Sequence, residues 1–197
     1  MDKKIEKLVA TAVRMGASDV GIISASDIMV EDNLAKLCNG HPACENYGRS
    51  MSCPPHVAGP QQFREWQKQS DRALVVRIEV PSSVMFSNER REVMQLLHEI
   101  VASVEREAIR MGFDGSRAFA GGSCKNLFCA DQPDCRVIDE NGNCRNPESA
   151  RPSMSGFGIN VTEMIRSAGW PLKIASRDDA VNSESMTWVA GLVLIIK

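Results

Sequence analysis

The chain has 197 residues, of which 43% are hydrophobic and 24% charged, so it can bury an ordinary globular core in one domain. Its formal net charge of −2 gives no general attraction to nucleic acid or to anionic membranes. Its seven cysteines are too few for a disulfide scaffold and, being odd in number, cannot all pair within the chain.

Neither the start of the chain nor its apolar runs predict export or membrane insertion. The charged segment 1–7 has no apolar h-region behind it, and the longest apolar run, 189–196, is far shorter than the ~20 residues that span a bilayer. We therefore expect a cytoplasmic protein. In that reducing compartment, clustered cysteines are more often metal ligands or redox groups than disulfides.

Apolar periodicity predicts helices that alternate with strands. In chain order we expect a helix over 3–15, a strand over 20–24, a helix over 60–69, a strand over 72–80, a long helix over 88–111, a strand over 113–120, a helix over 161–168, and strands over 172–175 and 187–196. Residues 27–37 fit either a brief strand at 28–30 or a helical turn, and 178–185 reads as a loop or hairpin tip. This order predicts an α/β (α+β) sandwich with a mixed or antiparallel sheet, of which a ferredoxin-like arrangement is one form.

Three of these elements carry specific expectations about burial. The strand over 72–80 alternates, so we expect one covered face, whereas the strand over 187–196 is apolar throughout and should be covered on both faces. In the long helix, His98 is assigned to the polar side and given no ligand role.

The first cysteine-rich segment, 38–56, contains three cysteines and two of the three histidines of the chain. Its cysteines could hold a metal together with an outside ligand, a histidine or an open position. The other interpretation is a turn rich in Pro and Gly with incidental thiols. The residues concerned are Cys38, Cys44, Cys53, His41 and His56.

The second cysteine-rich segment spans 121–152 and contains four cysteines among Gly, Asn, Asp and Pro. Without apolar periodicity, it reads as a loop rather than a helix or strand. A loop can bend four thiolates toward one point, and such a set suits zinc or an iron–sulfur cluster. Four unrelated thiols, some of them simply buried, are the other interpretation. The residues concerned are Cys124, Cys129, Cys135 and Cys144.

Several motifs spread over most of the chain resemble a known family. They are the run from Cys44 to Pro55, Gly121-Gly122-Ser123-Cys124, Cys144-Arg145-Asn146-Pro147, Ala150-Arg151-Pro152-Ser153-Met154 and Gly158-Ile159-Asn160-Val161. Together they resemble the predicted metal-binding proteins of domain of unknown function 2284. The resemblance implies metal binding and no established reaction.

Three functions follow from the cysteines. The first is an iron–sulfur protein for electron transfer or redox maintenance of a partner protein, with a [4Fe–4S] cluster on the four-cysteine segment and a second cluster, with one open iron, on the other. An open iron could bind a substrate, so the sequence leaves open whether the protein is an enzyme. The second is a zinc-stabilised protein-binding module, because three cysteines and one histidine are an ordinary zinc set. The third is a thiol-redox enzyme, against which the lack of a Cys-x-x-Cys pair counts.

The sequence favours iron–sulfur over zinc because seven cysteines exceed the needs of one zinc ion. It leaves homo-oligomer formation open. Arg136, Arg145 and Arg151 lie near the four-cysteine segment, where they either steady the negative charge of a thiolate centre or form surface salt bridges.

Overall fold

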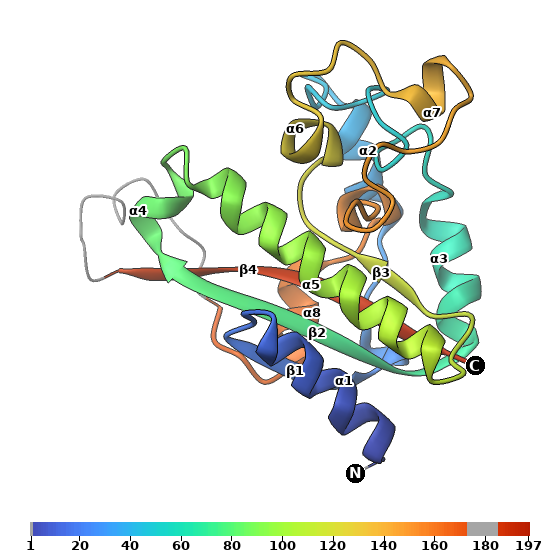
Figure 1. Cartoon of the computed structure of the whole chain (residues 1–197), viewed down its shortest axis with the longest axis vertical. Coiled ribbons are helices and arrows are strands. Elements are labelled where there is room, and N and C mark those ends of the chain that lie inside the picture. The colour runs from blue at the N-terminus through green and yellow to red at the C-terminus, as the bar shows by residue number, and fades with distance from the viewer. Residues whose placement is uncertain (1, 173–184) are drawn as a thin grey trace.

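An antiparallel sheet lies at the middle of the molecule in the computed structural model, which describes residues 2–172 and 185–197 (Figure 1). The strand order in this described part is β1-β2-β4-β3, and each neighbouring pair is antiparallel. The two long strands pair with each other from Ser70 opposite Ile196 to Pro81 opposite Met186. The strands are β1 (Asp19–Ser24), β2 (Ser70–Pro81), β3 (Arg117–Phe119) and β4 (Met186–Ile196).

Helices cover both faces of this sheet. The α-helices are α1 (Lys3–Arg14), α2 (Asp32–Lys36), α3 (Gly59–Lys68), α4 (Ser82–Met85), α5 (Arg90–Arg110), α6 (Cys124–Phe128), α7 (Arg136–Asp139) and α8 (Val161–Ser167). Three short 3-10 helices are η1 (Ala25–Asp27), η2 (Leu37–Asn39) and η3 (Met154–Phe157). Among the described residues, no helix combines the length and the apolar character needed to cross a membrane.

The core consists of two layers, one on each side of the sheet. Helices α1 and α5 pack on one side, where Leu8 and Leu97 meet Leu74 and Val193. Helix α3, η3 and α8 pack on the other side, where an aromatic group of Phe63, Phe119 and Phe157 meets Ala73, Val75 and Leu192. Because successive residues of a strand point to opposite faces, β2 and β4 must be apolar on both.

The predicted α+β class and antiparallel sheet are confirmed. The described elements do not follow the β-α-β-β-α-β order of a ferredoxin-like unit, because helices separate each strand from the next. Strand β4 is buried on both faces, as expected.

Several sequence expectations were wrong in detail. Strand β2 is covered on both faces rather than one, since Ala73 and Val75 belong to the second layer. The strand expected over 113–120 is only Arg117–Phe119, because the chain before it turns at Gly115. In segment 27–37, both structures held plausible occur in part: a single bridge from Val30 to Ile159, and then helix α2. Residues 173–175 of the strand expected at 172–175, and 178–184 of the loop expected at 178–185, lie outside the described residues.

Gly158 ends η3 and ties this turn to the segment before α2. Its φ of +68° lies in the left-handed region, and an added Cβ would overlap the carbonyl oxygen of Glu31. The backbone N–H of Glu31 donates to the Gly158 carbonyl at 2.8 Å, so the two segments cannot separate without losing this bond.

We predict that Gly158→Ala lowers the free energy of unfolding by more than about 2 kcal/mol, since backbone strain and a steric overlap add. The matched control is Gly169→Ala, where φ is +75° but no atom lies within 4 Å of the added Cβ. This control should lose only about 1–2 kcal/mol from backbone strain. Urea denaturation measures both values, and equal losses would contradict the close approach at Gly158.

Candidate metal centre

The two cysteine-rich segments lie together at one end of the molecule, around α6 and α7 and to one side of α5 (Figure 1). A backbone junction joins three distant parts of the chain there. Ala120 N–H donates to Pro152 at 3.0 Å, Met154 N–H donates to Ala120 at 3.0 Å, and Ser153 N–H donates to Ser52 at 2.9 Å. This junction brings the segment before Cys124 beside the segment that contains Cys53.

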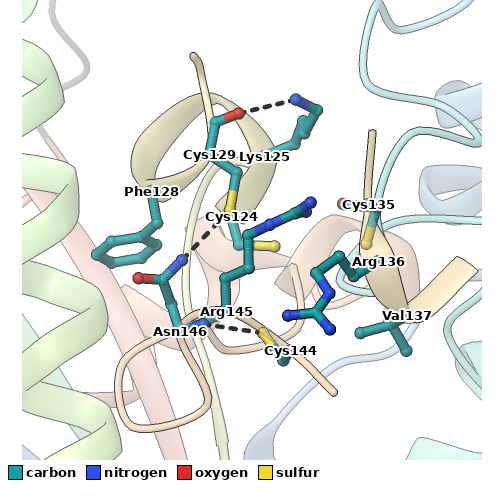
Figure 2. Close-up of a pocket in the computed structure, with 12 residues that line it drawn as sticks. Cys124, Lys125, Phe128, Cys129, Cys135, Arg136, Val137, Cys144, Arg145 and Asn146 are labelled. Carbon is teal, nitrogen blue, oxygen red and sulfur yellow. Dashed lines mark hydrogen bonds between the residues drawn. The ribbon is translucent and has the colours of Figure 1, made fainter. Parts of the chain in front are cut away.

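Four cysteines line one cavity in this region, namely Cys124, Cys129, Cys135 and Cys144. Figure 2 shows Cys124 and Cys129 at the two ends of α6 and Cys135 and Cys144 on two other stretches of the chain, with Arg136, Arg145 and Asn146 among them. The cavity measures about 20 Å³, because these side chains fill much of the space. That volume accommodates about one water molecule.

The sequence predicted a loop for the four-cysteine segment, but the structure has two short helices there. This segment contains α6, which begins at Cys124, and α7, which begins directly after Cys135. Asp139 accepts from the backbone N–H of Cys135 at 2.9 Å and so closes the first turn of α7. Helices of one turn carry too few residues to show an apolar period, so sequence periodicity could not reveal them.

Polar groups contact the sulfur atoms of this cavity. The side-chain amide of Asn146 donates to Cys129 Sγ at 3.2 Å, and its backbone N–H donates to Cys144 Sγ at 3.4 Å. Hydrogen bonds of this kind stabilise thiolates and adjust the potential of a metal–thiolate centre. Asn146, which the sequence had singled out only as part of a family motif, is therefore a supporting residue of this cavity.

One thiol in each segment, Cys124 and Cys38, is a poor anion before a cation binds. Burial raises the pKa of Cys124 to about 11, and the charges of Cys144 and Cys53 add to the rise. Hydrogen bonds with the hydroxyls of Ser52 and Ser50 act in the opposite direction and lower this pKa. Burial, followed by the charges of Cys44 and Cys53, also raises the pKa of Cys38. A metal would have to displace these protons, and neither thiol has the low pKa of a reactive cysteine.

Lys125 is a buried cation beside the four cysteines, with 5% of its surface exposed. Its Nζ donates to the carbonyl oxygens of Cys129, at 2.8 Å, and of Gln132. Within the described part of the chain, no carboxylate pairs with it. A buried ammonium group without a counter-ion is unfavourable, so an anionic centre in the cavity would stabilise it.

All three arginines form salt bridges, and two of them also line the cavity. Arg136 and Arg145 line the cavity, and each also pairs with a carboxylate, Glu140 at 3.2 Å and Asp134 at 3.0 Å. Arg151 lies outside the lining and forms a salt bridge to Glu105 at 2.6 Å, so the local salt bridge is its observed role.

The other three cysteines, Cys38, Cys44 and Cys53, line a second cavity of about 140 Å³. Cys44 N–H donates to the Cys38 carbonyl at 3.1 Å, which closes the loop between these two cysteines. His41 and His56 are absent from the described lining of this cavity and of the four-cysteine cavity. The structure therefore offers no support for a histidine ligand at either place.

The cysteines share cavities without converging on a point. Within residues 2–172 and 185–197, no three His, Cys, Asp or Glu side chains stand close enough together to hold a metal ion. Around a tetrahedral zinc ion, thiolates at about 2.3 Å from the metal lie about 4 Å from each other. Metal binding would thus require the side chains between the sulfur atoms to move.

His98 is a structural residue that the sequence placed wrongly. It is fully buried rather than on the polar side of α5. Its Nε2–H donates to the Gly121 carbonyl at 3.0 Å, and its Nδ1 accepts from Arg151 N–H at 3.1 Å. It thus ties the helix to the chain on both sides of the four cysteines. Met94 and Ala102, four residues before and after His98, are both apolar and buried, and this spacing could have predicted that His98 lies on the buried side of α5.

A sequence model of the predicted metal-binding proteins of domain of unknown function 2284 matches residues 21–195. The chain belongs to this family. The family match supports a metal site in general, and the resemblance seen in the sequence is confirmed. No curated protein and no solved structure matches the chain.

We predict that His98 makes stability depend on pH. Burial is the main cause that lowers the pKa of His98 to about 4 in the folded protein. The unfolded chain therefore binds a proton at this residue near pH 6.5, whereas the folded chain does not. The stabilisation is complete above about pH 6.5 and falls by up to about 3 kcal/mol as the pH drops toward 4.

The measurement is the free energy of unfolding by urea across this pH range, for the wild type and for His98→Gln. Gln keeps an N–H donor but has no titratable ring. The variant should lose most of the slope above pH 4.5. Equal slopes in the two proteins would show that His98 is already protonated in the fold.

Proposed function

We propose that this protein carries a [4Fe–4S] cluster on Cys124, Cys129, Cys135 and Cys144 and serves in electron transfer or redox chemistry. The observation that carries the proposal is the composition of one cavity. Four thiols line it together with the cations of Lys125, Arg136 and Arg145, and no carboxylate belongs to its described lining. Such a site suits a group that is bound by thiolates and is negatively charged overall.

A centre bound by these four thiolates would carry a net negative charge. The four thiolates outweigh the positive charge of a cubane core or of a zinc ion, so the loaded centre is an anion. Lys125, which has only carbonyl partners in the described structure, would then gain the counter-ion it lacks. Asn146 would hold two of the sulfur ligands, and the bound cluster would supply a one-electron carrier.

Iron–sulfur ligation is favoured over zinc by the donor set and its spacing. Cysteine is the only usual zinc or iron ligand in the described lining of either cysteine cavity, which removes support for a Cys₃His zinc site. The described residues also contain no group of three potential ligands close enough together for a single ion. A polyatomic cluster separates its ligands more widely than one ion does.

A zinc-stabilised protein-binding module is the second candidate. The small volume of the four-cysteine cavity, about 20 Å³, is the observation that favours it, because a single ion needs less rearrangement than a cluster. In either case we place the protein in the cytoplasm, where reduced thiols persist. A redox partner protein is the partner we expect in the first case, without a role for nucleic acid or membranes.

The test of cluster binding is purification without oxygen. We expect brown protein with a broad visible absorption that bleaches with dithionite, and loss of this absorption in Cys129→Ala. The matched control is Val137→Ala, which changes the same cavity lining without removing a sulfur ligand, and it should keep the absorption. Colourless protein with stoichiometric zinc would decide for the zinc module.

The test of the charge argument is the reduction potential. Lys125→Met should lower the midpoint potential by on the order of 50 mV, because a nearby positive charge favours the more negative, reduced centre. Lys125→Arg keeps the charge and should shift the potential less. Redox titration followed by electron paramagnetic resonance measures all three proteins at equal iron content. An unchanged potential in Lys125→Met would contradict the charge-balancing role.

A further inference from the structure

The cavity of Cys38, Cys44 and Cys53 is built differently from the four-cysteine cavity. Its volume of about 140 Å³ is many times the ~10–15 Å³ that holds one water molecule. Its described lining contains three thiols, polar uncharged side chains such as Asn46 and Ser155, and no carboxylate. The cavity therefore has three sulfur donors and room for a polyatomic group, although these donors do not stand close enough together in the described structure to hold a single ion.

Three buried serines separate this cavity from the other, and we call them the hydroxyl wall: Ser50, Ser52 and Ser123. Ser50 lines the four-cysteine cavity, and Ser123 lines the three-cysteine cavity. Their hydroxyl oxygens lie 3.4 Å apart, and Ser50 and Ser52 lie 3.0 Å apart. The two cavities are thus neighbours that share one thin wall.

Ser52 contacts a cysteine from each group. Its hydroxyl lies 3.8 Å from Cys53 Sγ and accepts from the backbone N–H of Cys124 at 3.3 Å. Cys53 and Cys124, distant in sequence, are therefore separated by a single hydroxyl group. Groups bound to these two residues would lie close enough to influence each other.

The residues that line the three-cysteine cavity differ in exposure. Cys53 at the wall is buried, with 6% of its surface exposed, whereas Cys44 is an exposed thiol and Tyr47 in the same lining has 36% of its surface exposed. The described lining provides no fourth cysteine and no histidine. A cluster held there would keep one coordination position for a ligand from outside.

We propose that Cys38, Cys44 and Cys53 hold a second iron–sulfur cluster, which lies across the hydroxyl wall from the first and has one iron open to a small anionic ligand. The proposal rests on the proposed function of the four-cysteine cavity. Three soft thiolates suit such a cluster, and the open iron acts as a Lewis acid that takes an anion.

The experiment compares iron content and magnetic resonance in three proteins prepared without oxygen. The wild type should hold about eight iron and eight sulfide ions per chain, and Cys44→Ala and Cys135→Ala should each hold about four. Reduced wild type should show a spin–spin interaction between clusters that is absent from both variants. Cyanide, as the small anion, should change the signal of the wild type and of Cys135→Ala but not of Cys44→Ala.

The control is His41→Ala, which removes the histidine nearest in sequence to these cysteines and should keep all the iron. Loss of iron in this control would overturn the open position. A wild type with about four iron ions, unchanged in Cys44→Ala, would overturn the second cluster and leave the first in place. Loss of all iron in Cys44→Ala with unchanged circular dichroism would overturn the separation into two centres. Absence of iron from every protein would overturn the proposed function itself.

Discussion

The backbone junction of Ser52, Ala120 and Ser153 is the constraint on which the site depends. Its hydrogen bonds, each about 3 Å long, join segments that are far apart in sequence. The junction is rigid because Ala120 follows strand β3 and is itself buried in the core. Each cysteine group is therefore attached to the sheet near the same point, and the cysteines of both groups gather at one end of the molecule.

The segments around this junction are held in place by hydrogen bonds, whereas the core is held together by apolar contacts. His98 fixes Gly121 and Arg151 from helix α5, and Ser52 fixes Cys124. Buried polar groups of this kind are stable only when their partners are in place, so they specify one arrangement of the loops. Two groups depart from this rule: Asn46 Oδ1 is buried without a hydrogen-bond partner, and the charge of Lys125 has only carbonyl partners in the described structure. Under the proposed function, the unbalanced charge of Lys125 links the fold to the metal.

Much of the fold could be predicted because helices α1, α3, α5 and α8 and strand β2 have clear apolar periods, and strand β4 is a continuous apolar run. Sequence clustering also grouped the cysteines as the two cavities group them. The hydroxyl wall could not be predicted, because serines carry no periodic signal and Ser50 meets Ser123 only through tertiary structure. Similarly, because charged residues occur along β2, the sequence did not reveal that Ala73 and Val75 lie on its second face and pack in the second layer.

The central claim is that iron and sulfide are bound by cysteine at this end of the molecule. X-ray absorption at the iron edge of protein prepared without oxygen tests it most directly. The account predicts a first shell of sulfur alone around iron in the four-cysteine centre, isolated in Cys44→Ala, together with scattering from neighbouring iron atoms. A first shell of oxygen and nitrogen, or iron without iron neighbours, would contradict it.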